Sequence, residues 1–257
     1  MSKLWNFNLP FFHGKSTTID WIPNDSKKEF EKHISMYPDS EHLNNYKNNP
    51  IKYKLNNYGF RTDDDFFDGD IGTVYLGCSH TFGLGHYLEN TWSYKLHQKV
   101  GEGKFFNLSC GGVGLTTQYY FLKYFSDMLN IKKVYHYYPP EVRYRYGFMN
   151  GDGKIDVFAK YFDEETSSVD TELWKKYLVH ETHNEFHNKL HLDAITCLCS
   201  LIECDYIRVE NSYMNDKFCD AYHKELTPSR DLLNPYVERH DKIVDNFLKL
   251  NRNNSVI

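Results

Sequence analysis

Two short segments of the sequence carry the residues that are best suited to chemistry. In the first, an apolar run from Thr73 to Leu76 ends at Gly77 and is followed by the hydroxyl residue Ser79. The run has the length and the β-branched and aromatic content of a buried strand. A strand that ends in Gly-x-Ser presents its hydroxyl at the carboxyl edge of a sheet, which is where open α/β sheets bind ligands.

The second segment repeats this pattern further along the chain. A short strand over residues 105–108 is expected to break into a turn that contains Gly111, Gly112 and Gly114, and a helical pattern follows over residues 115–129. Glycines in such a turn let the backbone approach a ligand closely, so that their N–H groups can donate to an anionic oxygen. We therefore expect the two turns to face one crevice.

Both segments resemble motifs of the SGNH (GDSL-type) hydrolase family. Residues 76–83, Leu-Gly-Cys-Ser-His-Thr-Phe-Gly, are similar to the family's first block, Leu-Gly-Asp-Ser followed by a Gly. Residues 107–112, Asn-Leu-Ser-Cys-Gly-Gly, are similar to its second block, Asn-Leu-Gly-x-x-Gly. The resemblance implies a three-layer α/β/α sandwich with a doubly wound, flavodoxin-like, mainly parallel sheet. It also implies that Ser79 is the nucleophile and that the N–H groups of Ser79 and Gly112 belong to an oxyanion hole.

The order of the two blocks decides how Ser79 is interpreted. Taken alone, Ser79 would be better explained as the N-cap of a helix that follows a strand. Because the second block follows in its expected place, we instead interpret Ser79 as the nucleophile. A segment that reads Asn56-x-x-Gly-Phe-Arg61 stands shortly before the Ser block and is also common in SGNH-like proteins, so the resemblance begins near residue 51.

The third block of the family departs from its usual form in this chain. Residues 132–138 are expected to form the strand that leads to a Gly-x-Asn-Asp block, whose Asn side chain completes the family's oxyanion hole. The corresponding residues, 139–143, read Pro-Pro-Glu-Val-Arg and contain no Asn. Arg143 is the candidate substitute for the missing donor.

The last block departs at the residue that should be the catalytic base. The family has Asp-x-x-His, usually followed by Pro, and this chain has Asp231-Leu-Leu-Asn234-Pro. A serine hydroxyl is a weak nucleophile until a base takes its proton, and an amide cannot do so near neutral pH. With this alignment we expect hydrolysis to be severely reduced. Asn234 also has a purely structural interpretation, as the N-cap of an amphipathic helix that continues through Leu248.

Other histidines are candidates for the base, with Asp231 as the residue that orients it. His240 lies roughly 9 Å further along the helix than the usual base position, where family members often carry a second His. His80 and His86 are close to Ser79 in the sequence, but His80 neighbours the serine in a turn and is expected to point elsewhere.

The remaining pattern predicts the elements that position these residues. A helix over residues 26–33 has Asn24 and Asp25 as cap candidates, and residues 51–55 alternate like an edge strand. A helix runs toward Val100 with Asn90 as its cap candidate. A long helix over residues 171–203 then leads to a last strand over residues 206–209.

Length and composition bound the kind of protein. The chain has 257 residues and a mass of 30.6 kDa, which fits an N-terminal extension over residues 1–70 that packs on one main domain over residues 71–257. A net charge of −5 and a pI near 6.2 provide no basic footprint, so nucleic acid is not expected as a partner. Because the sequence has no long apolar run and no signal-peptide pattern, we expect a cytoplasmic protein with no membrane partner, or alternatively a virion-associated one.

The sequence leads us to expect no metal and no cofactor. The six cysteines show no C-x-x-C pairs, so free thiols in a reducing compartment explain them best. The acidic run over residues 63–70 is interpreted as a solvated loop. Residues 150–156 lack the end carboxylates of a calcium loop and are interpreted as a hairpin turn. Four histidines line one face of the long helix but lack a further zinc ligand, and we interpret them as a neutral stripe: His180, His183, His187 and His191.

Two functions of different classes follow from these residues. The first is a serine ester hydrolase that acts on a small-molecule or carbohydrate ester, with Ser79 as nucleophile and Asp231 behind a histidine base. The second is a catalytically impaired SGNH-like binding or structural module, for example a phage-encoded one, and it is favoured by Asn234 and by the altered third block. A flavodoxin-like nucleotide binder ranks lower because the first strand is not followed by Gly-x-Gly-x-x-Gly. The oligomeric state is left open.

Overall fold

A four-stranded parallel sheet forms the centre of the protein. The computed structural model describes residues 16–22, 25–111, 113–138, 145–149, 155–159, 181–210, 229–230 and 236–254. The strand order is β4-β3-β5-β8, and all three pairings are parallel. The strands are β3 (Ile71–Gly77), β4 (Lys104–Ser109), β5 (Asn130–Tyr138) and β8 (Asp205–Glu210).

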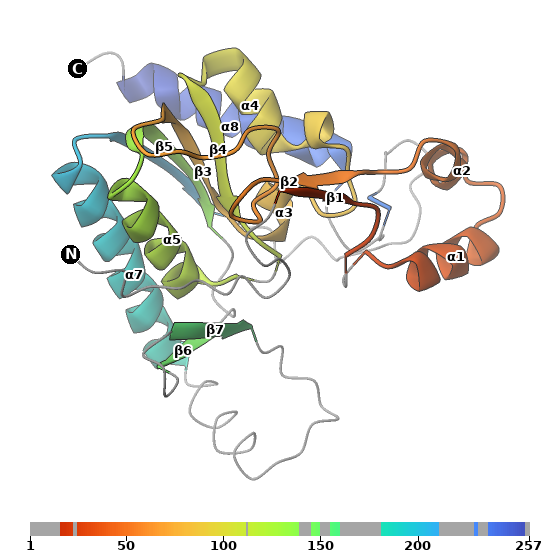
Figure 1. Cartoon of the computed structure of the whole chain (residues 1–257), viewed down its shortest axis with the longest axis horizontal. Coiled ribbons are helices and arrows are strands. Elements are labelled where there is room, and N and C mark those ends of the chain that lie inside the picture. The colour runs from red at the N-terminus through yellow and green to blue at the C-terminus, as the bar shows by residue number, and fades with distance from the viewer. Residues whose placement is uncertain are drawn as a thin grey trace, which may run out of the picture.

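Helices cover both faces of this sheet (Figure 1). One face packs against α4 (Trp92–Val100) and α8 (Val237–Asn254), and the other against α5 (Leu115–Ser126) and α7 (Glu181–Leu201). Strands that are buried on both faces read as nearly continuous apolar runs, which is the pattern of residues 73–76. The expectation of an α/β fold with a parallel sheet between helices is therefore confirmed.

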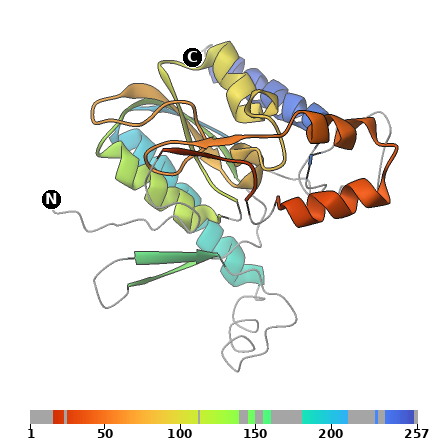
Figure 2. The same ribbon diagram turned by 45° about the vertical axis from the view of Figure 1, so that its right-hand side comes forward.

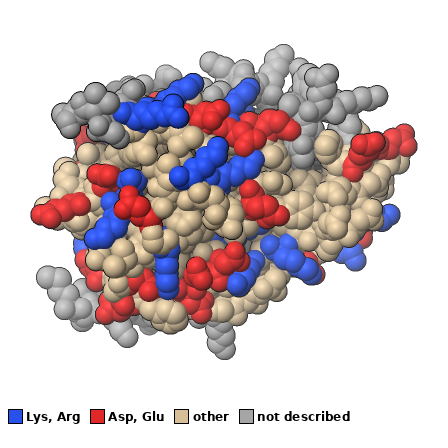
Figure 3. Space-filling model, turned by 90° about the horizontal axis from the view of Figure 1, so that it is seen from above, with Lys and Arg blue, Asp and Glu red and all other residues tan. Residues whose placement is uncertain are grey.

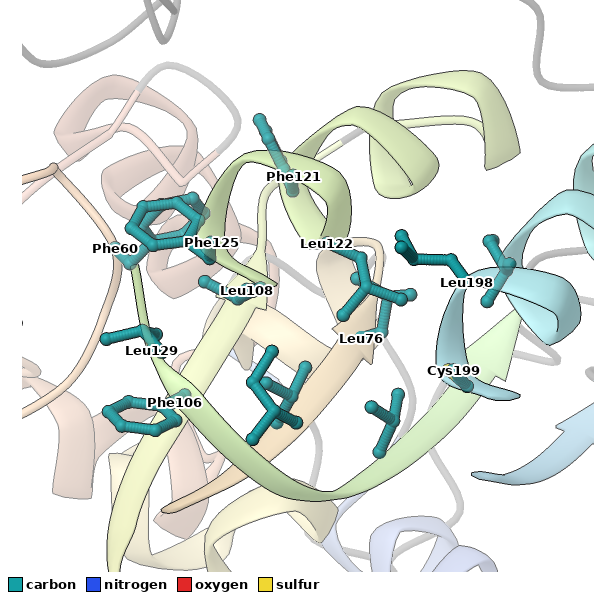
Figure 4. Close-up of a cluster of buried hydrophobic side chains, with 14 of the residues drawn as sticks. Phe60, Leu76, Phe106, Leu108, Phe121, Leu122, Phe125, Leu129, Leu198 and Cys199 are labelled. Carbon is teal, nitrogen blue, oxygen red and sulfur yellow. The ribbon is translucent and has the colours of Figure 1, made fainter. Parts of the chain in front are cut away.

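The two faces of the sheet have different cores. Toward α5 and α7 the core is built from aliphatic and phenyl side chains, several of which meet edge to face, such as Phe60 and Phe125 (Figure 4), whose ring centroids are 5.4 Å apart. Toward α4 and α8 the buried side chains are larger and more polar, and they include Tyr75, Tyr135 and Trp92. The second face can therefore bury hydroxyl and ring nitrogen groups close to the sheet.

The described residues before 56 form a layer of their own, which we call the N-terminal layer (Figure 2). Strands β1 (Thr17–Ile19) and β2 (Tyr53–Leu55) pair antiparallel, and helices α1 (Lys27–Met36) and α2 (Glu41–Asn48) lie between them in sequence. A hydrophobic cluster joins the layer to Phe82 and Leu84 of the main body. The expected α1 is confirmed. The sequence did not predict α2, in which only Leu43 and Tyr46 are buried.

Serine and threonine caps begin several helices. Ser26 Oγ accepts the N–H of Glu29 at 3.2 Å, so Ser26 caps α1, and the expectation of Asn24 or Asp25 as its cap is wrong. Thr91 caps α4 in the same way, in place of the expected Asn90, which instead ends a short 3₁₀ helix, η1 (Leu88–Asn90).

A separate hairpin is formed by β6 (Arg145–Met149) and β7 (Ile155–Ala159), which pair antiparallel. This pairing agrees with a hairpin turn between them, although the turn residues themselves lie outside the described residues, as do Arg143 and His180.

The described helices include none that is long and apolar enough to cross a membrane. The face in Figure 3 shows acidic and basic side chains interspersed, without a large patch of one sign.

Candidate active site

The carboxyl ends of three adjacent strands meet at one edge of the sheet. Gly77 at the end of β3 lies opposite Ser109 of β4 and Tyr137 of β5. β3 leads through α4 to β4, whereas β5 leads through α7 to β8 on the opposite face. The connections therefore diverge between β3 and β5, and in doubly wound sheets a ligand crevice forms at such a point.

Ser79 stands at this edge, at the start of a one-turn helix, α3 (Ser79–Phe82). Its exposed fraction is 7%, so the residue is buried within the turn. A Cβ on Gly77 would overlap the side chain of Thr81 and lie 2.8 Å from the carbonyl oxygen of Tyr137, so the turn requires glycine. The N–H of Ser79 belongs to the first helical turn, whose N–H groups have no acceptor within the helix.

A buried arginine holds the other end of this turn. Arg61 Nη1 donates to the carbonyl oxygens of Phe82, at 3.2 Å, and Gly83, and its Nη2 donates to the carbonyl oxygen of His86 at 2.7 Å. Gly83 ends α3 in the left-handed region, at φ 77°, and its N–H donates to Ser79 O at 2.9 Å. Burial lowers the pKa of Arg61 to about 10, so the guanidinium remains charged at neutral pH. We call this set of contacts the Arg61 clamp.

The segment that carries Arg61 is fixed by its own turn. Asn56 Oδ1 accepts the N–H groups of Tyr58 at 3.0 Å and Phe60 at 2.9 Å, and Asn56 N–H donates to Phe60 O at 2.9 Å. Phe60 enters the main core beside Phe125. The Asn-x-x-Gly-Phe-Arg pattern therefore has a physical basis here, because its first residue makes the turn and its last residue clamps residues 79–86, which we call the serine loop.

The second block is tied to the first by a buried amide. Asn107 Nδ2 donates to Arg61 O at 3.1 Å and to Thr81 O at 3.4 Å, and Ser109 Oγ donates to Asn107 Oδ1. Asn107 is fully buried in β4. The side chain thus links the strand before the glycine turn to α3. Gly112, the predicted oxyanion donor, lies outside the described residues.

A second buried network reaches the glycine turn from the opposite face. The distance from Tyr206 Oη to His136 Nδ1 is 2.8 Å, and that from His136 Nε2 to Gln118 Oε1 is 2.6 Å. Gln118 Oε1 is an acceptor, so the His136 proton lies on Nε2 and Tyr206 donates to Nδ1. Burial, with a smaller contribution from Arg208, lowers the pKa of His136 to about 3. His136 is therefore neutral at physiological pH.

His240 of α8 is also buried, and one of its ring nitrogens is occupied. The N–H of Trp92, at the start of α4, donates to His240 Nδ1 at 3.0 Å. An imidazole that accepts at Nδ1 carries its proton on Nε2 when neutral. Within the described part of the chain, His240 Nε2 has no hydrogen-bond partner. Burial, and then the nearby His86 and His80, lowers the pKa of His240 well below its usual value.

The other two histidines near the serine are buried as well. His86 packs against His240 with ring centroids 4.9 Å apart, and His80 faces Tyr137 at 6.2 Å. Within the described residues no side chain hydrogen-bonds to the hydroxyl of Ser79. The structure thus brings three buried imidazoles, those of His80, His86 and His240, into this region.

The C-terminal segment approaches the serine loop at Arg230. Its N–H donates to the carbonyl oxygen of Gly85 at 2.7 Å. Its guanidinium pairs with Asp25, with Nε 3.0 Å from both carboxylate oxygens and Nη2 2.6 Å from Oδ2. Both side chains are buried. The next residue along the chain is Asp231, and both Asp231 and Asn234 lie outside the described residues.

Sequence reasoning identified some of these residues and missed others. Arg61 and Asn107 belong to the motifs quoted from the sequence. The motifs indicated that these residues matter, but not which atoms they contact. Asp25 and Arg230 are separated by 205 residues and belong to no motif, and nothing in the sequence indicated that they pair. The described residues contain no group of three or more potential metal ligands placed to hold an ion.

Comparisons with known proteins add no name to this site. No protein-family model matches the sequence, and no curated protein matches it.

Proposed function

We propose that the protein is a serine ester hydrolase of the SGNH-like type, with Ser79 as its nucleophile. The observation that carries the proposal is the position of Ser79. It begins a glycine-dependent turn at the carboxyl end of a central parallel strand, and the buried side chains of Arg61 and Asn107 hold that turn. A hydroxyl fixed in this way at the edge where doubly wound sheets bind ligands is suited to attack a bound acyl group.

The proposed reaction has two steps. Ser79 Oγ adds to the ester carbonyl carbon while a base takes its proton, and the bond to the alcohol breaks as the leaving oxygen is protonated. Water then cleaves the acyl-serine and restores the hydroxyl. The N–H groups of Ser79 and Gly112 are the proposed donors to the oxyanion, and Asp231 is proposed to orient the base.

Ser79→Ala tests the nucleophile. We expect turnover of p-nitrophenyl acetate by the unmodified protein to fall to background in this variant, and a fluorophosphonate probe to add its phosphonyl group to Ser79 with loss of fluoride. Ser200→Ala, which changes an exposed serine of α7, is the matched control and should leave both measurements unchanged. Turnover that is the same with and without the Ser79 hydroxyl would refute the proposal.

A second candidate is a module that binds an ester or carbohydrate without cleaving it. It is favoured by two observations, namely Asn234 at the usual base position and the Trp92 N–H on His240 Nδ1. An imidazole in this state must give up the Trp92 contact before Nδ1 can accept a proton. Absence of Ser79-dependent turnover, with the fold intact, would select this candidate.

Two substitutions of His240 separate a base from a structural residue. In His240→Asn the amide oxygen can replace Nδ1 as the acceptor for Trp92 N–H, but it cannot take a proton near neutral pH. If His240 is the base, His240→Asn keeps the melting temperature and loses turnover. If His240 serves only the start of α4, His240→Asn keeps both, whereas His240→Ala lowers the melting temperature.

A further inference from the structure

We propose that the buried pair of Asp25 and Arg230 is a positioning device that docks the C-terminal segment against the loop after Ser79. This inference rests on the proposed function, because it assigns the N-terminal layer a part in the same site. The observation behind it is the meeting of three distant parts of the chain, represented by Asp25, Gly85 and Arg230. Asp25 and Arg230 are positioning residues in this proposal and touch no substrate.

Arg230 is held by directed contacts on several sides. Nη2 donates to Asp20 O at 2.7 Å in addition to its bond to Asp25 Oδ2. The guanidinium lies over the ring of Trp21, with Cζ 3.9 Å from the ring centroid. The backbone N–H is bound to Gly85 O. The serine loop therefore fixes the main chain of Arg230, and the N-terminal layer fixes its side chain.

Tyr53 completes the link between layer and loop. Its hydroxyl donates to Asp25 Oδ2 and accepts the N–H of Gly85 at 2.9 Å. Burial, together with the Asp25 carboxylate, raises the pKa of Tyr53, so the phenol keeps its proton. Gly85 thus receives one contact from Tyr53 at its N–H and one from Arg230 at its carbonyl, and both contacts depend on Asp25.

The place of Arg230 in the sequence gives these contacts their functional meaning. Consecutive Cα atoms lie about 3.8 Å apart, so fixing Arg230 fixes the point at which the chain enters residues 231–234. That stretch holds the Asp-x-x-Asn sequence that resembles the last catalytic block. The layer therefore sets where the block starts relative to the loop that follows Ser79.

Stability alone gives little reason for such a pair. Replacing a buried ion pair by apolar side chains of similar volume is often neutral or stabilising, whereas an ion pair with directed hydrogen bonds specifies one geometry. A catalytic group displaced by about 1 Å can lose roughly 100-fold in rate. We therefore expect removal of the pair to act on kcat, and KM to change little because neither residue touches substrate.

The decisive variant is the double substitution Asp25→Leu with Arg230→Met, which removes both charges and keeps an apolar volume. We expect its melting temperature to stay near that of the unmodified protein. We expect its kcat for p-nitrophenyl acetate to fall roughly 10- to 100-fold, with KM unchanged. Lys52→Met, which removes an exposed pair with Asp20 in the same layer, is the matched control and should leave kcat unchanged.

Amide hydrogen exchange provides a readout that does not need activity. In the double variant we expect faster exchange at Arg230 and Gly85 than in the unmodified protein, and no change within α5. A stable double variant with unchanged exchange at these amides and unchanged kcat would overturn the inference. If the unmodified protein shows no Ser79-dependent turnover, the proposed function fails, and unchanged exchange at Arg230 would then overturn the docking as well, whereas faster exchange would support the docking alone.

Discussion

The N-terminal layer and the central sheet bury basic side chains in opposite ways. Near the layer, the guanidinium groups of Arg61 and Arg230 lie on the Tyr53 ring, 4.5 Å and 5.9 Å from its centroid, and both remain charged. In β5, and in α8 where it packs against the sheet, burial lowers the pKa values of His136 and His240, so both imidazoles are neutral. A buried charge needs several acceptors, whereas a neutral ring needs only one donor and one acceptor.

The two arginines differ from each other in the acceptors that they use. Among the residues that the structure describes, Arg61 donates only to backbone carbonyl oxygens, whereas Arg230 pairs with the carboxylate of Asp25. Loss of Arg61 would leave dipoles unsatisfied, but loss of Arg230 would leave a buried charge without its counter-ion. Removing Arg230 alone from its pair with Asp25 should therefore cost more free energy of unfolding than removing Arg61 from its carbonyl acceptors.

The largest expected effect is that of Arg230→Met alone. It leaves the buried Asp25 carboxylate unpaired, and we expect the free energy of unfolding to fall by about 3–5 kcal/mol. Urea unfolding followed by circular dichroism measures this change. Adding Asp25→Leu should restore most of the loss. A single variant as stable as the double variant would show that Asp25 carries no buried charge that matters for stability.

The next effect is a dependence of stability on pH, which His136 of the central sheet causes. The folded pKa of His136 is about 3 and its usual value is 6.5, so between these values the unfolded chain binds more protons than the folded one. Stability should therefore fall as the pH is lowered through this window, by about 1.4 kcal/mol per pH unit at most and by about 1.6 kcal/mol from pH 6.5 to 5.

Urea unfolding of His136→Gln at several pH values checks this assignment. The variant should be less stable near neutral pH, because Tyr206 and Gln118 lose their shared partner, but it should lack this part of the decline toward acid. His42→Gln, in the half-buried part of α2, should keep the decline of the unmodified protein. Parallel pH curves for all three proteins would contradict the assignment.

Arg61→Lys should have a smaller effect. Lysine keeps the charge but lacks the planar fork that reaches three carbonyl oxygens, so we expect a loss of about 1–2 kcal/mol. We also expect slower fluorophosphonate labelling of Ser79, because the end of α3 is held less firmly. The control is Arg252→Lys at an exposed position of α8. Equal labelling rates in the two variants would exclude a role for the clamp in positioning Ser79.

The smallest effect is expected for Lys52→Met. Its ion pair with Asp20 joins side chains that are 56% and 49% exposed, and solvent screens such a pair strongly. We expect a change in the free energy of unfolding of at most about 1 kcal/mol. A larger loss would mean that surface charge in the N-terminal layer supports the docking of Arg230.

Much of the fold follows from local sequence, because apolar runs and helical periodicity are local signals. The runs that form β3, β4 and β5 and the helix α5 were predicted close to their observed bounds. Helix α2 was missed, since this short polar helix buries only two side chains, Leu43 and Tyr46. Asp25 illustrates the remaining limit, because a carboxylate just before a helix fits a local cap as well as a partner found only in three dimensions.

The turn that carries Ser79 was predicted for a similar reason. The turn at Ser79 has a local signature, because Gly77 is required by a steric contact within the same segment and its strand neighbours. The state of His240 has none, because its Nδ1 is occupied by a backbone group that lies 148 residues earlier in the chain. Tautomers and buried charges depend on such distant neighbours, and sequence spacing does not report them.

The span between Asp25 and Arg230 also has a consequence during protein synthesis. The two residues are 205 positions apart, so a ribosome that adds about 5–20 residues per second completes the second roughly 10–40 s after the first. Throughout that interval the nascent N-terminal layer lacks the cation that neutralises its buried carboxylate. The layer can therefore reach its final form only after residue 230 has been added, and a product truncated before that residue would leave this polar centre without its counter-ion.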